Sequence, residues 1–260
     1  MRVSANLTML FTDVPLAARY EKAAAVGFKL AEIALPYSEP AEVLLENSQK
    51  FGIQHSLINA PAGDWASGFR GLAALKSHKN EFKESIDKAV EYARKLDCKR
   101  VHVMAGLAEK GDVEAKTCYL DNIKFAAQKL AENDITCLIE PINSYTIKGY
   151  FLNSYEQAKE VLDQVSLPNL KIQYDVFHAQ QINGQLTATL EKYNNDIGYL
   201  QVAQVPHRLS PGFDGEVDYK YIFDVARKIN PDWIIGCEYN QSKQNPEKDF
   251  VWASAMGLKF

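Results

Sequence analysis

The sequence is poor in residues that several common kinds of functional site require. Its four cysteines, Cys98, Cys118, Cys137 and Cys237, form no Cys-x-x-Cys pair, so a zinc knuckle is not expected. This use of cysteine fits a reduced, intracellular compartment. The 260 residues include only five histidines, and 29 basic residues stand against 33 acidic ones, a net charge of −4. Because nucleic-acid surfaces need clustered Lys and Arg, no nucleic-acid partner is predicted.

Long hydrophobic runs are also missing. No apolar stretch approaches the roughly 20 residues that span a bilayer, so no membrane partner is expected. The N-terminal MRVSANLTML lacks the apolar segment of a signal peptide, and the C-terminal GLKF is not the peroxisomal tripeptide. These absences predict a cytoplasmic protein.

Strand-like and helix-like segments alternate from one end of the chain to the other. The predicted strands are 3–7, 30–35, 54–59, 100–105, 136–141, 170–175, 198–204 and 233–238. The predicted helices are 14–26, 39–51, 75–97, 113–133, 154–165, 219–229 and 246–256, with two short helices in 176–193 separated at Gly184. Several helices end at a Gly, Asp or Asn that is followed within a few residues by the next apolar run.

Eight strand–helix repeats with short connections predict an α/β fold, a parallel (β/α)8 TIM barrel that forms one domain over residues 1–260. The alternative is an open, doubly wound sheet, which ordinarily has a glycine-rich loop after its first strand. Here Thr8-Met9-Leu10-Phe11 follows that strand, and no Pro/Gly/Ser-rich linker divides the chain. The closed barrel is therefore preferred.

Four polar residues lie near the ends of the last four predicted strands. They are Glu140 in LIEPIN, Asp175 in IQYDVFH, Gln201 in YLQVAQV and Glu238 in IIGCEYN. Buried carboxylates are costly unless they are paired or bind a metal. Since the strand ends of a barrel ring one pocket, we expect these oxygen donors to hold one divalent cation, with Mg²⁺ or Mn²⁺ favoured over Zn²⁺. The alternative is four separate polar residues, each paired at its own loop.

Further polar residues are expected at the same rim and are predicted to bind substrate. His102 and His178 face the pocket mouth in this arrangement, and Asn6, Glu32 and Asn59 from the first three strands complete the ring. Arg208, in the long seventh loop, is the leading candidate for binding a substrate carboxylate, because a guanidinium can bind a carboxylate through two parallel hydrogen bonds.

A metal flanked by two carboxylates suits proton transfer next to a carbonyl group. The metal supplies polarisation of a carbonyl and its α-hydroxyl, and one carboxylate removes the C–H proton to give an enediolate. Return of the proton to the neighbouring carbon is aldose–ketose isomerisation, whereas return to the opposite face is epimerisation. Glu140 and Glu238, three strands apart, could flank such a substrate.

The sequence resembles the hydroxypyruvate isomerase family. The resemblance rests on SANLTMLF, ALPY, LINAPAGD, VHVMAG, LIEPIN, DVFH, QVAQVP and GCEY, which occur in order between residues 4 and 239. It implies a xylose-isomerase-like barrel that interconverts hydroxypyruvate, a small hydroxy-carbonyl acid, and 2-hydroxy-3-oxopropanoate. It also implies that Glu140 and Glu238 are the catalytic pair and that Asp175 and Gln201 complete the metal site. The family usually has Pro-Gly-Arg where this chain has Pro206-His207-Arg208.

Three other functions remain open at this level. A ketose 3-epimerase of the same fold typically has a His in place of Gln201, so the amide favours the isomerase. A metal-dependent phosphodiesterase like endonuclease IV needs more His ligands than this chain offers. A non-catalytic metabolite-binding barrel is disfavoured by the three carboxylates. Whether catalysis requires the metal, and whether the chain forms a homo-oligomer, are not determined by the sequence.

Overall fold

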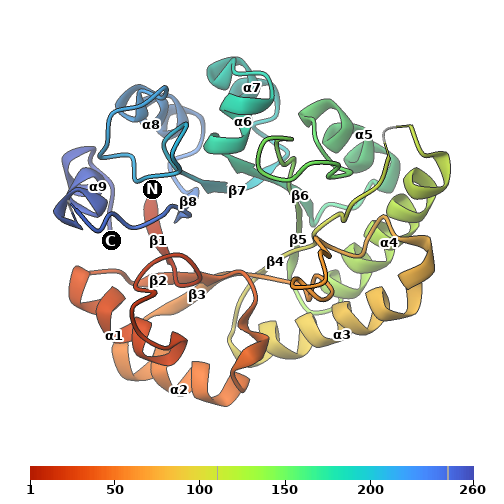
Figure 1. Ribbon diagram of the computed structural model, residues 1–260, viewed down its shortest axis with the longest axis horizontal. Helices are drawn as coiled ribbons and strands as arrows, with labels where there is room; N and C mark the ends of the chain where they lie inside the picture. The colour runs from red at the N-terminus through yellow and green to blue at the C-terminus, as the bar shows by residue number, and fades with distance from the viewer. Residues whose placement is uncertain (110, 245) are drawn as a thin grey trace.

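Eight parallel strands close into a barrel in the order β1 to β8, surrounded by helices (Figure 1). This computed structural model describes residues 1–109, 111–244 and 246–260. The strands are β1 (Arg2–Asn6), β2 (Leu30–Ile33), β3 (Gln54–Asn59), β4 (Arg100–His102), β5 (Thr136–Ile139), β6 (Leu170–Asp175), β7 (Ile197–Gln201) and β8 (Ile234–Cys237). The barrel closes because Ala5 pairs with Ala31 of β2 on one side and with Cys237 of β8 on the other. The predicted TIM barrel is confirmed.

The helices cover the outside of the barrel, one or more after each strand. The α-helices are α1 (Leu16–Val26), α2 (Ala41–Phe51), α3 (Lys79–Lys95), α4 (Val113–Ala131), α5 (Tyr155–Val165), α6 (Val176–Ile182), α7 (Leu186–Lys192), α8 (Tyr219–Ile229) and α9 (Val251–Ala255). Three short 3₁₀ helices are η1 (Pro36–Ser38), η2 (Lys76–His78) and η3 (Pro246–Asp249). The pair α6 and α7 matches the two short helices expected in 176–193.

Side-chain caps and glycines set several helix ends. The side chains of Asp112, Ser154 and Asp218 accept hydrogen bonds from backbone N–H groups in the first turns of α4, α5 and α8. Gly27 and Gly52 end α1 and α2 with positive φ angles of 115° and 65°, which a residue without Cβ adopts at little cost. The sequence-level stop signals therefore correspond to real helix ends.

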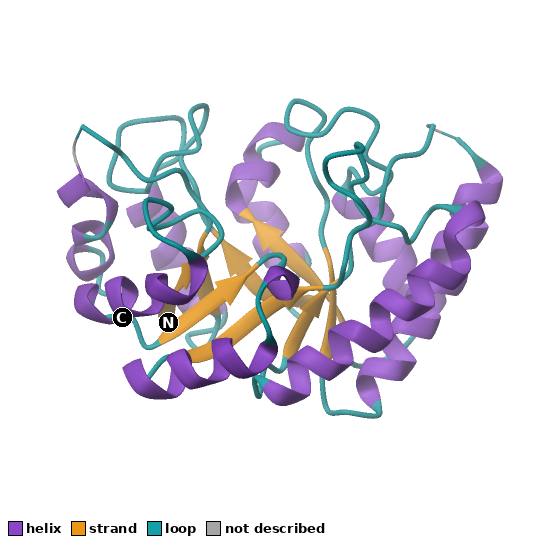
Figure 2. Cartoon of the chain, turned by 60° about the horizontal axis from the view of Figure 1, so that its bottom comes forward, coloured by secondary structure: helices purple, strands orange, loops and turns teal. Residues whose placement is uncertain are grey.

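The two ends of the barrel differ in the length of their loops. The connections from each helix to the next strand are two to four residues long, whereas most connections from strand to helix are longer. Figure 2 shows the long loops gathered at the end of the barrel to which the strands point. The exception is β6, which passes directly into α6 at Asp175 and Val176.

The barrel interior is filled rather than open. Leu30, Leu57, Leu138, Tyr199 and Ile234 form a buried cluster of their own, separate from the larger core between sheet and helices. These residues come from β2, β3, β5, β7 and β8, so they meet across the barrel axis. A packed interior is typical of TIM barrels, whose functional sites lie at the loop end.

Six of the eight predicted strands extend beyond the observed ones at their C-terminal ends, whereas the predictions for β3 and β6 end at the observed residues. Strand β4 ends at His102, yet Val103, Met104 and Ala105 stay buried, and Ala105 pairs with Gly71 of another loop. Buried apolar residues thus continue beyond the last residue that pairs with a neighbouring strand. The hydrophobic pattern alone therefore cannot locate the end of the strand. At the C-terminus, the single helix predicted over 246–256 is divided into η3 and α9. None of the helices in the described ranges has the length and apolar content to cross a bilayer.

Candidate active site

A cavity of about 660 Å³ opens at the loop end of the barrel. Its polar floor contains six of the predicted site residues, which are Asn59, His102, Glu140, His178, Arg208 and Glu238. Apolar side chains such as Met9, Leu35 and Ile142 form much of its wall. A concave, largely apolar cavity with a few convergent polar groups is the usual form of a small-molecule site.

The direct junction between β6 and α6 positions His178, which lines the cavity, and Asp175, which is buried beside it and is not part of the lining. Asp175 is the last residue of β6 and the N-cap of α6, where its Oδ1 accepts a hydrogen bond of 2.8 Å from the N–H of Phe177. The cap leaves Oδ2 without a hydrogen-bond partner. One turn later, His178 places its Nε2 3.6 Å from that Oδ2. The spacing Asp-x-x-His therefore puts both groups on one side of the first helical turn.

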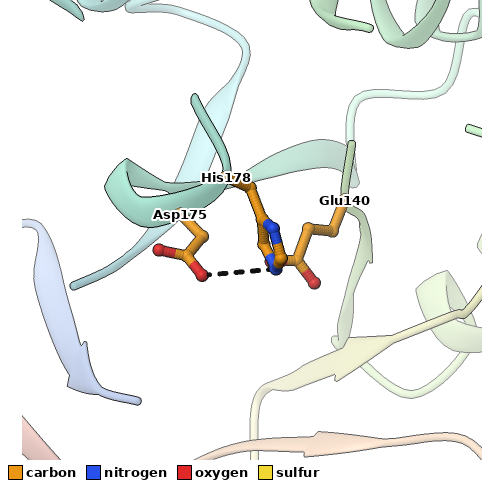
Figure 3. Close-up of side chains that lie close together, drawn as sticks. All are labelled: Glu140, Asp175 and His178. Atoms are coloured by element: carbon orange, nitrogen blue, oxygen red, sulfur yellow. Dashed lines mark ion pairs between the residues drawn. The ribbon is translucent and has the colours of Figure 1, made fainter. Parts of the chain in front are cut away.

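Glu140, which directly follows β5, approaches two imidazoles. Its Oε1 lies 4.0 Å from His178 Nε2, and its Oε2 lies 3.7 Å from His102 Nε2. Figure 3 shows Glu140, from the end of β5, converging with Asp175 and His178, from the junction of β6 and α6. These three buried side chains are close enough together to hold a metal ion.

Burial and like charges raise the pKa values of the two carboxyl groups. Burial, then Glu238 and Asp175, raise the pKa of Glu140 well above its ordinary value. Burial also raises the pKa of Asp175 to about 7, although Arg208 opposes the shift. Concentrated carboxyl groups with raised pKa values favour either a shared proton or a bound cation.

Both imidazoles are neutral. Burial lowers the pKa of His102 to about 3, and burial with Arg208 and His102 nearby lowers the pKa of His178 well below its ordinary value. Their contacts with Glu140 and Asp175 are therefore not ion pairs. Each imidazole instead offers one N–H donor and one nitrogen acceptor.

Asn143 decides which nitrogen of His178 carries the hydrogen. Its Oδ1 accepts hydrogen bonds from the N–H groups of Tyr145 and Thr146, so its amide group faces His178 with the Nδ2 end. That Nδ2 donates to His178 Nδ1 over 2.7 Å. With Nδ1 accepting, the hydrogen of the neutral ring is on Nε2, which points toward Asp175 and Glu140. In this tautomer His178 is a donor into the site, and it could bind a metal through Nε2 only in the other tautomer.

Several buried polar atoms around the cavity have no hydrogen-bond partner among the described residues. They are His102 Nδ1, His102 Nε2, Glu140 Oε1, Gln173 Oε1 and Asp175 Oδ2. Unsatisfied buried polar atoms are rare in proteins, and an ion or substrate is an ordinary reason for them. The donor set of carboxylate oxygens fits a divalent cation.

Arg208 is already paired with carboxylates. Its Nη2 lies 2.8 Å from Glu238 Oε2 and 3.7 Å from Asp175 Oδ2, and its guanidinium lies 4.9 Å from the ring centre of Phe177. The neighbouring His207 is exposed and its φ is not positive, so the backbone there does not require the glycine that the family usually has. The sequence predicted Arg208 at the pocket but not this pairing.

Gln201 and Asn6 lie buried outside the cavity lining and belong to a hydrogen-bonded layer centred on Glu32. Asn6 Nδ2, Tyr199 OH and Gln201 Nε2 donate to the Glu32 carboxyl group over 2.7, 2.5 and 2.9 Å. Gln201 Oε1 accepts from Gln173 Nε2 over 2.6 Å. Burial, then Glu238, raise the pKa of Glu32 to about 8, with the three donors opposing the shift.

Four residues of the site were missed at the level of sequence. Gln173 lies two positions before Asp175, and a polar residue at that spacing in an apolar strand was an available signal, because alternate residues share one face. Asn143 lies three residues after Glu140, and no sequence signal indicates its contact with His178. Trp65 and Arg70 line the cavity from the loop after β3. That loop was recognised as long and irregular, but its residues were not assigned.

Comparison with known proteins agrees with this architecture. The family model described as xylose isomerase-like TIM barrel matches residues 20–257. The chain is 54% identical to a putative hydroxypyruvate isomerase of Caenorhabditis elegans, with 100% of this chain and 98% of the relative covered. It is 40% identical to the hydroxypyruvate isomerase of Escherichia coli, with coverage of 92% and 93%, and 39% identical to a 2-oxo-tetronate isomerase of Cupriavidus necator, with 92% of each covered.

A solved structure extends the comparison to three dimensions. The crystal structure of an AP endonuclease, family 2, from Brucella melitensis superimposes with a TM-score of 0.93. That protein is 36% identical, and the match covers 98% of both chains. The fold and the full length of the barrel are thus shared with a relative of known structure.

The Asn143→Asp variant should change the protonation of His178. A carboxylate in place of the amide accepts from Nδ1 instead of donating to it, so Nδ1 should gain a hydrogen while the turn made by Oδ1 is kept. Nitrogen-15 NMR of the histidine rings measures this directly. The exposed Asn153→Asp adds the same charge elsewhere and should leave the ring unchanged. An unprotonated Nδ1 in Asn143→Asp would contradict the assignment.

Proposed function

Because this chain belongs to the hydroxypyruvate isomerase family of the xylose isomerase-like TIM barrels, we propose that it interconverts hydroxypyruvate and 2-hydroxy-3-oxopropanoate. The observation that carries the proposal is that Glu140 and Glu238, from the ends of β5 and β8, line one cavity together with two neutral imidazoles. Two carboxyl groups in one enclosed site can remove and return a carbon-bound proton. The whole chain, residues 1–260, is proposed to act as one domain.

The proposed reaction moves one proton between adjacent carbons. A carboxylate removes a proton from C3 of hydroxypyruvate, and the electron pair forms an enediolate between C2 and C3. A carboxyl group then delivers a proton to C2. The C3 hydroxyl loses its proton and becomes the aldehyde, and the C2 oxygen gains one and becomes the hydroxyl, so atoms and charge balance.

The surroundings of the two glutamates suit different halves of this transfer. Glu238, which forms the 2.8 Å ion pair with Arg208, is proposed as the group that removes the proton. Burial and its acidic neighbours raise the pKa of Glu140, which favours a proton on this carboxyl group while no cation is bound to it. The Nε2–H of His178 and the imidazole of His102 are placed to hydrogen-bond the substrate oxygens, and Asn59 and Arg208 complete the substrate-binding side chains.

A divalent cation, Mg²⁺ or Mn²⁺, is proposed to be held by Glu140, Asp175 and Glu238, with Gln201 as the fourth ligand. The unpartnered Glu140 Oε1 and Asp175 Oδ2 support this set. When bound, such an ion supplies polarisation of the substrate carbonyl. Gln201 can take part only through Oε1, which already accepts a hydrogen bond from Gln173. A carbonyl oxygen has two lone pairs, so the two interactions are compatible.

A four-carbon sugar acid is the second candidate substrate. The 2-oxo-tetronate isomerase relative and a cavity of about 660 Å³, which is roomy for a three-carbon acid, both favour it. A ketose 3-epimerase and a non-catalytic metabolite-binding barrel are the remaining alternatives. The epimerase would act on neutral sugars, and the binding protein would exchange no carbon-bound protons.

Proton NMR in D₂O with purified protein tests the function. We expect solvent deuterium to enter C3 of hydroxypyruvate and C2 of its product. The carboxyl group that has removed the proton can exchange it with D₂O before a proton is returned to the enediolate. The same measurement on 2-oxo-tetronate and on neutral ketoses gives the specificity. Faster exchange into neutral ketoses would replace the isomerase by the epimerase, and no exchange into any compound would support the binding protein.

Glu140→Gln and Glu238→Gln should each reduce kcat by about 10²–10⁴, the usual contribution of a general acid or base. Glutamine keeps the shape of the side chain but cannot exchange the proton. The exposed Glu160→Gln on α5 is the matched control and should keep the activity of the unaltered protein. Activity within a few-fold of normal in both site variants would exclude the two-glutamate mechanism.

Calorimetric titration with Mn²⁺ should find about one site per chain, weakened at least tenfold in Asp175→Ala. The substitution removes Asp175 Oδ2, which has no hydrogen-bond partner, together with Oδ1, which caps α6. Asp163→Ala, which breaks a surface ion pair with Lys159, should leave the affinity unchanged. Equal Mn²⁺ affinity in both variants would show that Asp175 is not a ligand.

A further inference from the structure

We propose that Arg70 binds the carboxylate of the substrate, at a subsite formed by the loop after β3. The inference rests on the proposed function, since it names the residue that recognises the acidic group of the same substrate. Arg70 comes from the loop between β3 and η2 and lines the cavity together with Trp65.

The topology places the two arginines of the cavity on opposite sides. Arg70 follows β3 and Arg208 follows β7, and in a closed ring of eight strands these positions are four strands apart. Glu238 follows β8 and is paired with Arg208. A substrate whose reacting carbons lie near Glu238 can therefore extend its far end toward Arg70.

The backbone at Arg70 is held firmly against the loop after β4. Gly106 N–H donates to the carbonyl of Arg70, and Gly71 N–H donates to Ala62. Gly71 has a φ of 115°, and a Cβ there would lie 2.4 Å from the carbonyl oxygen of Met104. Only glycine permits this approach of two backbones, so the loop presents Arg70 from a fixed position.

The guanidinium group of Arg70 is oriented but only partly used. Its Nη1 donates to the carbonyl oxygens of Trp65 and Phe69 over 3.0 and 2.6 Å, and its central carbon lies 4.0 Å from the ring centre of Trp65. Its remaining N–H groups, on Nη2 and Nε, have no hydrogen-bond partner in the part of the chain that the structure describes. Stacking and one anchored nitrogen fix the plane of the group and leave donors for a carboxylate.

Charge distribution favours Arg70 over Arg208 for this role. The floor of the site holds Glu140 and Glu238, Asp175 is buried beside them, and Arg208 is paired with Asp175 and Glu238. A substrate carboxylate on the floor would meet those acids. Arg70, the other arginine of the cavity lining, forms an ion pair with no carboxylate among the described residues. It is thus the cation whose charge is available.

Arg70→Gln and Arg208→Gln, compared side by side, test the assignment. With hydroxypyruvate, Arg70→Gln should raise KM about ten- to hundredfold, the effect of losing a charge-assisted hydrogen bond, with little change in kcat. Arg208→Gln should lower kcat, because it releases Glu238. Dihydroxyacetone replaces the carboxylate by a neutral hydroxymethyl group, and its inhibition constant should be unchanged by Arg70→Gln. Arg70→Lys keeps the charge, so its KM for hydroxypyruvate should lie between those of the unaltered protein and Arg70→Gln.

Circular dichroism establishes that the variants are folded, and a second measurement uses the unaltered protein. Phenylglyoxal modifies accessible arginines, and peptide mass spectrometry locates them. Hydroxypyruvate should protect Arg70, whereas dihydroxyacetone at equal occupancy or at its solubility limit should not.

The proposal is overturned if Arg70→Gln keeps KM for hydroxypyruvate within twofold, or if carboxylate compounds fail to protect Arg70. It is equally overturned if Arg208→Gln alone shows the selective rise in KM, which would restore the role first predicted for Arg208. If the protein isomerises neither acid, the proposed function fails by itself. The phenylglyoxal measurement can then be made with a panel of carboxylates and their neutral analogues. Protection of Arg70 by the carboxylates alone would still support the subsite.

Discussion

Closure of the sheet through the pairing of β1 with β8 is the constraint on which the rest of the molecule depends. It brings the ends of all eight strands into one ring, so Glu140, Asp175 and Glu238 meet although they lie far apart in the sequence. It also makes a packed interior, and a cavity opens at the loop end of the barrel. The carboxyl groups are therefore crowded together, and burial and neighbouring carboxyl groups raise the pKa values of Glu140 and Asp175.

The site is organised by contacts that define donors and acceptors rather than by charge alone. Asp175 uses one oxygen to cap α6, and its other oxygen, which has no hydrogen-bond partner, lies near His178 and Arg208. Asn143 is held by its own backbone turn and thereby sets the tautomer of His178. Beneath them, Glu32 accepts hydrogen bonds from three side chains and fixes the amide of Gln201. A site with predetermined donor directions loses little free energy in reorganising when a substrate arrives.

The two arginines of the cavity illustrate how identical side chains acquire different roles. Arg208 is flanked by the carboxyl groups of Asp175 and Glu238 and pairs with Glu238 over 2.8 Å, whereas Arg70 is stacked on Trp65 and has no acidic partner among the described residues. Trp65 is 44% exposed, so it is also available to cover the substrate. Selectivity for acids over neutral sugars would then be decided by residues of the loop after β3, which are different from the residues that transfer the proton.

The sequence by itself determined the barrel, because hydrophobic periodicity and helix stop signals are local properties of the chain. It also identified Glu140, Asp175 and Glu238, since a carboxyl group at the end of an apolar strand is conspicuous in any fold. Only the tertiary structure decided the partners: the pairing of Arg208 with Glu238, the contact of Asn143 with His178, and the free guanidinium of Arg70. These depend on side-chain directions in long loops, which no periodic pattern encodes, because they are fixed by contacts between segments distant in sequence.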